Sequence, residues 1–530
     1  MLRKVFGIIS YFPDNDTEYH KHIRRLRMRR CSELLLKLSS LWADIDIIII
    51  AQNWQDYKPP ITVSNHGIIY KYDKLGILQA RKTLREKFLE SDYDYLIMLD
   101  DDAVIECSDP SIYIDEIDKH PDSVGVIRHN NNPLMFMAIS KSVYKEINFP
   151  DINIENGEGF SNIIFAEKCF AQSDKAFDFP KGCVKELSHK HKYSELCPST
   201  WLSENSFDWS YMSYITEAYI QLAKHKRLPC TSDKNVDIVI PYVDSSDPVW
   251  QKSCLDAGNS DITSNRFRSW DTLKYLLRGV EKYMPFVRNV ILIVSDENQV
   301  PKWLNTKEVR VVYHRDFIPE EFLPTFNSCT IEAFLFNITK LSEQFIYFND
   351  DIFPINGMVA SDFFVDSKPL LRFQEHQNCI KQAVFSLQCR NSLDLITQML
   401  HLDNYDEGEL ITPDHSAMPM LKSSVDEVGL QCIEALKQSI SQFREDKNIN
   451  QYIYHYYHYF QKDYVEDCCP YLYLEINNNL NHIRYIILNN REIPLLCLND
   501  MDTVSNYKET QQELISIFEL KFPDNSKYEN

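Results

Sequence analysis

The fold is decided by two stretches, Tyr95-Leu-Ile-Met-Leu-Asp-Asp-Asp102 and Phe345-Ile-Tyr-Phe-Asn-Asp-Asp351. Each is an apolar run of strand length that ends in adjacent carboxylates. Ligands of open α/β sheets bind at the carboxyl ends of strands. Adjacent carboxylates repel one another, so a fold keeps them together only in open solvent or beside a cation. The sequence therefore predicts α/β domains with a cation site at a strand end, and a solvated acidic turn is the alternative interpretation of the first stretch.

The sequence around the first stretch alternates between strand-like and helix-like segments. Strand-like segments are rich in β-branched residues, whereas helix-like segments repeat apolar residues at intervals of three and four. Alternation of this kind indicates an α/β domain. The segments, in chain order, are Val5–Tyr11, Arg24–Leu41, Ile45–Ala51 and Leu75–Leu89.

A domain boundary is predicted at Lys224–Lys234, a polar stretch that contains proline. We therefore expect one domain at 1–225, a linker at 226–235 and a second domain at 236–530. Alternation resumes after the linker and becomes mostly helical from Val425 onward. The prediction is two Rossmann-like or GT-A-like α/β domains, the second with a helical insertion. Its predicted segments are Val236–Val243, Trp270–Tyr283, Asn289–Ser295, Val309–His314, Phe345–Phe348, Tyr452–Phe460, Leu495–Asn499 and Tyr507–Leu520.

The composition argues against several classes of protein. With 56 basic and 77 acidic residues the net charge is −21, which argues against nucleic acid as a partner. Only 12 glycines occur, and neither a phosphate-binding loop nor a dinucleotide fingerprint is present. No apolar stretch approaches the roughly 20 residues of a membrane span. The 14 cysteines form no CxxC, so we expect reduced thiols in the cytoplasm and no zinc site.

Polar residues gather in clusters after the apolar runs of the second domain. One cluster contains Arg266, Arg268 and Arg278, whose guanidinium groups suit bidentate binding of phosphate oxygens. Any single cluster is as well explained by a capped loop or a surface ion pair, but the succession of clusters indicates a site. The clusters are Pro241–Trp250, Asn265–Arg278, Tyr313–Asp316, Leu323–Glu332 and Phe345–Asp351.

The first domain resembles nucleotide-sugar glycosyltransferases of the GT-A type. In that family a strand ends in Asp-x-Asp, which binds a metal ion and the UDP-sugar and corresponds here to Asp100 and Asp102. Lys74–Arg81 is similar to the helix start that precedes this strand, which implies a substrate-binding role for Arg81. Glu158 falls where the family has its general base.

Residues 236–530 resemble the Stealth proteins, hexose-1-phosphate transferases that include bacterial capsule polymerases and the GlcNAc-1-phosphotransferase of lysosomal enzymes. The resemblance implies transfer of a sugar 1-phosphate from a UDP-sugar to an acceptor hydroxyl, with release of UMP. The four blocks of the family are matched, in order, by Asp237–Trp250, Arg266–Asp351, Thr412–Tyr457 and Cys497–Glu529.

Two histidines are candidates for the base that takes the acceptor proton. An imidazole has an ordinary pKa near 6.5 and can accept a proton near neutral pH. We prefer His415, because the family is similar at Pro413-Asp-His-Ser416, and keep His314 in reserve. The resemblance implies that Mg²⁺ or Mn²⁺ is held by Asp350, Asp351 and Asp500. It further implies catalytic or phosphate-holding roles for Asp244, Arg278, Asn327, Glu332 and Arg444. Substrate-binding roles are implied for Arg266, Arg268, Asp271, Asn349 and Asn499.

The sequence as a whole predicts a bifunctional enzyme that builds a capsular or surface polysaccharide with phosphodiester links. Its partners would be UDP-sugar donors and an oligosaccharide or lipid-linked glycan acceptor. We expect a cytoplasmic location, with any membrane association peripheral, at the inner face and beside capsule assembly proteins. One alternative is an active phosphotransferase whose first domain only binds the acceptor glycan. The other is a glycan-binding protein without catalysis.

Overall fold

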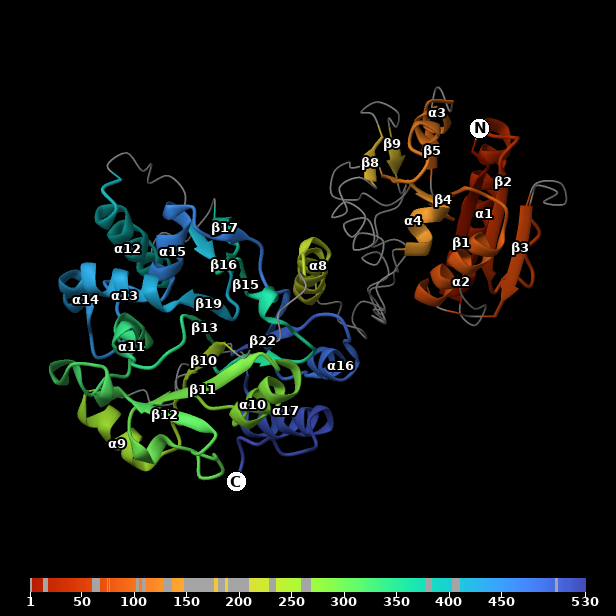
Figure 1. Ribbon diagram of the computed structural model, residues 1–530. Helices are drawn as coiled ribbons and strands as arrows, with labels where there is room; N and C mark the ends of the chain where they lie inside the picture. The colour runs from red at the N-terminus through yellow and green to blue at the C-terminus, as the bar shows by residue number, and fades with distance from the viewer. Residues whose placement is uncertain are drawn as a thin grey trace. The chain divides into compact units, whose positions relative to one another are not determined.

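The computed structural model describes residues 2–12, 18–59, 67–73, 75, 77–101, 104–106, 111–126, 136–146, 176–179, 186–188, 209–227, 235–258, 268–376, 384–402, 410–500 and 504–530. The chain divides into two compact units, Met1–Thr216 and Glu217–Asn530 (Figure 1). None of the helices in the described ranges is both long and apolar enough to cross a membrane.

The first unit is built on a seven-stranded sheet in the order β3-β2-β1-β4-β7-β6-β8. The neighbours β3, β2, β1 and β4 run parallel, whereas β7 is antiparallel to both β4 and β6. The elements are β1 Lys4–Tyr11, α1 Glu18–Leu41, β2 Asp46–Gln52, β3 Gly67–Tyr72, α2 Ile77–Glu90, β4 Tyr95–Asp100, β5 Val104–Glu106, α3 Ser111–Lys119, β6 Val124–Val126, β7 Phe136–Ser140, α4 Lys141–Glu146, β8 Ala176–Asp178 and β9 Glu186–Ser188. The next helix, α8 Trp209–Lys224, includes the division between the two units at Thr216.

Alternation along the strands of this sheet supplies two apolar faces. In β4, Tyr95 and Ile97 join the core that contains Leu34 and Leu35 of α1. The intervening Leu96 joins the opposite core, which contains residues of α2. Successive side chains of a strand point to opposite faces, so a continuous apolar strand is buried on both. The predicted strand at Tyr95–Leu99 is therefore a central, doubly covered strand.

The second unit has a five-stranded sheet in the order β12-β11-β10-β13-β19, parallel except for β19, and a smaller sheet β14-β22-β21. Its helices are α9 Pro248–Asp256, α10 Leu273–Tyr283, α11 Ser328–Ala333, α12 Val384–Met399, α13 Lys422–Gln431, α14 Ile433–Ser439, α15 Tyr452–Gln461, α16 Asn481–Asn489 and α17 Tyr507–Lys521. Its strands are β10 Val236–Pro241, β11 Val287–Val294, β12 Val309–Tyr313, β13 Gln344–Tyr347, β14 Ile352–Pro354, β15 Phe364–Val365, β16 Lys368–Leu371, β17 Phe373–His376, β18 Leu410–Pro413, β19 Met418–Leu421, β20 Val465–Glu466, β21 Tyr471–Ile476 and β22 Leu495–Asp500.

The prediction of α/β domains, the second with inserted helices, is confirmed. Helices α12 to α15 form the insertion and pack on the β13–β19 side of the sheet, while α10, α16 and α17 lie nearer β22 (Figure 1). The region after Val425 is less uniformly helical than predicted, because β21 lies within it and pairs in parallel with β22.

The start of the predicted linker is anchored to the second unit. Arg227 forms a two-pronged ion pair with Asp362, with Nε to Oδ1 and Nη2 to Oδ2 both at 2.8 Å. The His225 ring lies between Asp362 and Asp467, 3.0 Å from an oxygen of each. These residues belong structurally to the second unit, although they precede its first strand.

Candidate active site

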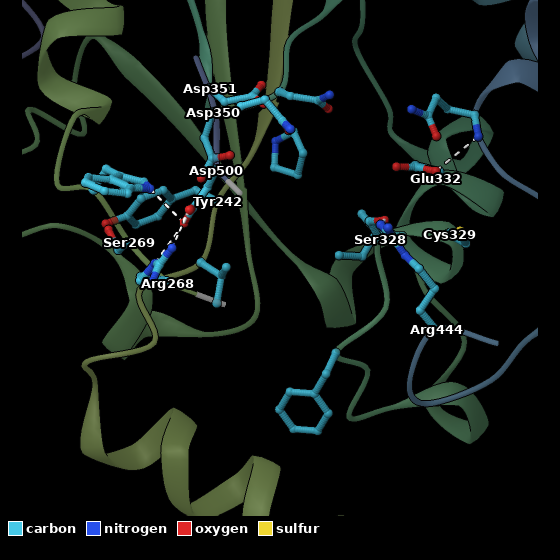
Figure 2. A pocket seen from close by; sticks show the side chains of 18 of the residues that line it. Tyr242, Arg268, Ser269, Ser328, Cys329, Glu332, Asp350, Asp351, Arg444 and Asp500 are labelled. Atoms are coloured by element: carbon cyan, nitrogen blue, oxygen red, sulfur yellow. Dashed lines mark hydrogen bonds and ion pairs between the residues drawn. The ribbon is translucent and has the colours of Figure 1, made fainter. Parts of the chain in front are cut away.

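A cavity of about 690 Å³ lies in the second unit at the carboxyl edge of the five-stranded sheet. Its walls include Tyr242, which follows β10, Asn349 to Asp351, which follow β13, and Leu498 to Asp500 at the end of β22. Parallel strands end at one edge of a sheet, which brings residues distant in sequence together. Figure 2 shows Asp350, Asp351 and Asp500 on one wall, and Glu332, Ser328 and Arg444 across the cavity from them.

Strand pairing explains how Asp351, His415 and Cys497 meet. Strand β19 pairs antiparallel with β13, and Met418 lies opposite Tyr347. The turn before β19, which contains His415, therefore lies beside the residues that follow β13. Pairing of β14 with β22 sets Ile352 opposite Cys497. The His415 Nε2 atom consequently lies 3.6 Å from Asp351 Oδ2, and Cys497 Sγ lies 3.8 Å from the same oxygen.

Two adjacent carboxylates follow β13, and one of them has a buried oxygen without a hydrogen-bond partner among the described residues. Asp350 is exposed to the cavity but lies deep in the fold, and this desolvation, together with the Asp351 charge, raises the pKa of Asp350 to about 7. Asp351 Oδ1 is buried and has no hydrogen-bond partner among the described residues. A buried carboxylate oxygen without a partner, next to a second carboxylate, fits a divalent cation with oxygen ligands.

The side chains of Asp351, His415 and Cys497 are close enough together to bind one metal ion. Ligand atoms of Asp351, His415 and Cys497 all lie within 4.8 Å of one another. Burial raises the pKa of the Cys497 thiol well above its ordinary value, with the Asp351 charge adding to the effect. A protonated thiol is a poor ligand for Mg²⁺ or Mn²⁺, so the carboxylate oxygens fit these ions better than the sulfur does.

His415 is the stronger of the two candidate bases. Burial lowers the pKa of His415, but the Asp351 carboxylate raises it by more, so that the result is above the ordinary value. His314 also lines the cavity, yet burial lowers its pKa to about 4. An imidazole with so low a pKa accepts a proton weakly near neutral pH.

Asp500, a predicted metal ligand, and Arg268, a predicted substrate-binding residue, are paired with each other. Arg268 Nε donates to Asp500 Oδ2 at 2.8 Å, and Nη2 donates to Oδ1. The indole Nε1 of Trp270 donates to Oδ2 as well, at 2.9 Å. Both residues line the cavity, but the Asp500 charge is already neutralised by a bidentate partner, so Asp500 is a weaker metal ligand than Asp351.

The opposite wall holds a buried acid beside an exposed arginine. Glu332 is 3% exposed, accepts from the backbone N–H of Gln451 at 3.0 Å and from the Tyr347 hydroxyl at 3.2 Å, and burial raises its pKa. Arg444 donates to Ser328 Oγ at 2.6 Å, and its charge opposes the rise in the Glu332 pKa. Arg444 is exposed and lines the cavity, as the phosphate-holding role requires.

Two predicted site residues, Arg278 and Asn327, bind other parts of the second unit. Arg278 is 5% exposed and forms a two-pronged ion pair with Glu529, at 2.8 and 2.7 Å, while its third nitrogen donates to Phe522 O. Asn327 caps α11 by accepting from the Cys329 N–H, and its amide donates to Asn448. Neither side chain lines the cavity, because both hold elements of the fold together.

Some of the remaining predicted site residues of the second unit line the cavity and others do not. Asp271, Asn349 and Asn499 line the cavity, and burial raises the pKa of Asp271. Asp244 lies outside the lining and accepts from Ser246. Burial, with the Asp244 charge adding to it, raises the pKa of the neighbouring Tyr242. Arg266 lies outside the described residues.

The predicted site of the first unit is described only in part. Asp100 is the last residue of β4, and Arg81 is buried in α2. Asp101, between the two predicted metal ligands, accepts from Ser10 Oγ at 2.5 Å. Asp102 and Glu158 lie outside the described residues.

Several cavity residues escaped the sequence prediction. Phe385 and Gln388 come from α12, Tyr452 is the first residue of α15, and Asn450 lies just before that helix. Phe385 is 49% exposed and lines the cavity. Cys497 precedes the Leu-Asn-Asp run of the fourth block, but a cysteine in an apolar strand gives no signal of its own.

Comparison with known proteins identifies the second unit. The family model described as Stealth protein CR2, conserved region 2, matches residues 266–371. The capsular polysaccharide phosphotransferase cps12A of Actinobacillus pleuropneumoniae is 30% identical over 346 residues, which are 59% of this chain and 90% of the relative. The capsular polysaccharide phosphotransferase WcwK of Streptococcus pneumoniae is 28% identical over 335 residues, 56% of this chain and 99% of the relative.

Solved structures match at a lower level. The S. aureus TarS 1-349 structure in complex with UDP-GlcNAc has a TM-score of 0.29 and 10% identity, over 42% of this chain and 66% of that one. The glycosyltransferase GlyE of Streptococcus pneumoniae has a TM-score of 0.24 and 11% identity, over 59% of this chain and 95% of that one. No conclusion is drawn at these scores. The family match and the sequence relatives are decisive, and the chain belongs to the Stealth family of phosphotransferases.

Proposed function

We propose that the second unit transfers a hexose 1-phosphate or N-acetylhexosamine 1-phosphate from a UDP-sugar to a hydroxyl of an acceptor glycan, with release of UMP. The observation that carries this proposal is the grouping of Asp350, Asp351 and His415 on one wall of a 690 Å³ cavity in a Stealth-family chain. The cavity is within the size range of sites for small-molecule ligands, roughly 300–1,000 Å³. The relatives are named as capsular polysaccharide phosphotransferases, which supports an acceptor in a capsular or surface polysaccharide.

The acidic wall provides the donor-phosphate side of the site. Asp350 and Asp351 would hold Mg²⁺ or Mn²⁺, with the side-chain oxygens of Asn349 and Asn499 as neighbouring donors in the cavity. When bound, the cation neutralises charge on the diphosphate. The Asp500–Arg268 pair lies at the same wall.

The proton balance of the transfer assigns a role to His415. The acceptor oxygen forms a bond to the phosphorus nearest the sugar, the bond from that phosphorus to the oxygen bridging to UMP breaks, and UMP leaves with the bridging oxygen. The acceptor hydroxyl loses its proton, and His415 Nε2 is the group that would take it. Asp351, 3.6 Å away, orients the ring and stabilises the imidazolium that results.

The opposite wall offers the chemistry that recognises a sugar acceptor. Phe385 presents an exposed ring in edge contact with Tyr452, at a centroid distance of 6.0 Å, and aromatic faces pack on the apolar side of sugar rings. Glu332 provides a hydrogen-bond acceptor nearby, and Arg444 a cation for a phosphate already present in the acceptor. We assign the acceptor to this wall.

For the first unit we propose a glycosyl transfer that alternates with the phosphotransfer. Joining the two activities in one chain would keep the growing glycan end near both sites and raise its effective concentration. Asp100 and Asp102 remain the proposed metal ligands and Glu158 the proposed base. The competing proposal is that this unit only binds the acceptor glycan. We propose a cytoplasmic location, with any membrane association peripheral.

Measurement of the released nucleotide tests the proposal. The full chain is incubated with single UDP-sugars, Mg²⁺ or Mn²⁺ and an oligosaccharide primer, and UMP and UDP are quantified. We expect Asp351→Asn to abolish UMP release and Asp102→Asn to abolish UDP release. Because the two transfers alternate, each variant should still perform the other transfer once, on a primer that ends in the acceptor of that step. Asp366→Asn, at a turn outside the cavity lining, is the matched control and should leave both releases unchanged. If no donor gives UDP, the proposed glycosyl transfer is refuted and only the phosphotransfer remains. If neither UMP nor UDP is released, the proposal of an enzyme is refuted.

A further inference from the structure

A second, much smaller cavity lies behind the turn that carries His415. It measures about 30 Å³ and shares no lining residue with the large cavity. Its polar lining comes from the residues on either side of His415, Asp414 and Ser416, and from Arg372 and His455. Asp414, Ser416 and His455 are buried, with Ser416 at 6% and His455 at 2% exposure, whereas the Arg372 side chain is 23% exposed.

Three polar atoms at this cavity lack hydrogen-bond partners. Arg372 Nη2, Ser416 Oγ and His455 Nδ1 are each buried, and none bonds to another atom of the described residues. Buried polar atoms are almost always hydrogen-bonded, to protein or to an ordered water molecule. Three such atoms on residues that line one small cavity point to a shared small ligand.

The hydrogen-bonding types of the three atoms select that ligand. His455 Nε2 lies 3.2 Å from the carbonyl oxygen of Pro419, so Nε2 carries the hydrogen and Nδ1 is left as an acceptor. Burial also lowers the pKa of His455 to about 3, which keeps the ring neutral. Arg372 Nη2 can only donate, while the Ser416 hydroxyl can do either.

Water alone matches this set. An anion would face the lone pair of His455 Nδ1, and a cation would face the guanidinium group of Arg372. A water molecule can accept from Arg372, donate to His455 and form a third bond with Ser416, and buried waters typically form about three bonds. The volume of about 30 Å³ has room for one such molecule.

The remaining bonds of Arg372 connect this site to His415. Arg372 Nε donates to Asp414 Oδ2 at 2.6 Å, and Nη1 donates to Glu217 in α8 at 2.9 Å. The guanidinium group therefore holds the residue before His415 directly and, through the water, the residue after it. We propose that Arg372 and one internal water, bound also by Ser416 and His455, are a positioning device that fixes the His415 turn for the transfer reaction.

The water site itself is tested by a crystal structure of the full chain at a resolution that shows ordered solvent. In the parent protein we expect one density peak within hydrogen-bonding distance of Arg372 Nη2, Ser416 Oγ and His455 Nδ1. In Ser416→Ala we expect this peak to be absent or to lie away from the position it has between the three atoms in the parent. An empty space in the parent protein, or direct contact among the three side chains, would overturn the proposal. This measurement does not depend on the function proposed above.

The positioning role is tested by kinetics and rests on the proposed function. We expect Ser416→Ala to lower kcat for UMP release about fivefold, the effect of losing roughly one hydrogen bond, with the donor KM little changed. Ser424→Ala is the matched control, because Ser424 is buried to a similar degree in α13, away from the small cavity. An unchanged kcat in Ser416→Ala would refute positioning, even with the water observed.

A double-mutant cycle shows whether Arg372 and Ser416 act through one water. Arg372→Lys keeps a cation opposite Asp414 but removes the Nη2 donor. Because both side chains bind the same molecule, the double variant should lose little more kcat than the worse single variant. Multiplicative losses would contradict a shared water. If the parent chain releases no UMP at all, the proposed function fails, and the crystal structure alone decides the water site.

Discussion

Deprotonation of His225 should weaken the second unit by an amount that can be calculated. The ring lies between Asp362, which is fully buried, and Asp467, at 3.0 Å from each. Burial lowers the pKa of His225, but the hydrogen bonds and charges of the two carboxylates raise it by more, to about 9. Its side chain is 4% exposed, so solvent screens these contacts little.

The rise in the pKa of His225 determines how much the free energy of unfolding changes with pH, and in which direction. A rise from the ordinary 6.5 to about 9 corresponds to about 3 kcal/mol, at 1.36 kcal/mol per pH unit. Since the folded state holds the proton more tightly, this stabilisation is fully present below pH 6.5 and is lost as the pH rises through about 9.

Denaturant unfolding of the full chain between pH 6 and 9.5 measures the effect. Other groups titrate over this range, so the quantity compared is the free energy of unfolding of the parent minus that of His225→Gln. We expect this difference to fall by about 3 kcal/mol across the range. His401→Gln, an exposed histidine of the same unit, should show no such trend. A difference that stays constant or grows with pH would refute the reasoning.

Three further predictions concern single side chains. Arg278→Met should cost about 3–5 kcal/mol of unfolding free energy, because it leaves Glu529 buried without its partner; an unchanged denaturation midpoint would contradict this. Phe385→Ala should raise the acceptor KM about tenfold by removing an apolar contact, and an equal rise in the donor KM would argue against an acceptor wall. Cys497→Ser should leave the Mg²⁺ concentration for half-maximal activity within about twofold, whereas a large increase would make the sulfur a ligand.

Elements whose signal is local could be predicted from the sequence. The predicted strand at Tyr95–Leu99 and the predicted helix at Tyr507–Leu520 differ from β4 and α17 by a single residue at one end. Apolar periodicity and strand-end carboxylates sufficed for these, because both are properties of neighbouring residues. The gathering of Asp350, Asp351 and His415 at one cavity also followed from strand ends and the family resemblance.

Roles that depend on distant partners could not be predicted. Arg278 resembles a phosphate ligand until Glu529, 251 residues later, is seen to bind it. The pairing of Arg268 with Asp500 likewise spans 232 residues. A guanidinium group serves a phosphate and a carboxylate equally well, so the residue type alone does not reveal which one it meets.

The central claim is phosphotransfer, and the fate of the donor's β-phosphorus tests it most directly. This is the phosphorus attached to the sugar in a UDP-sugar, so an isotopic label there follows the bond that breaks. The parent chain is incubated with labelled donor, cation and primer, and the products are separated by size. We predict that the label enters the glycan as a phosphodiester, in amounts equal to the UMP released, and that Asp351→Asn abolishes this incorporation. Label recovered only in UDP, with unlabelled sugar in the glycan, would contradict the account.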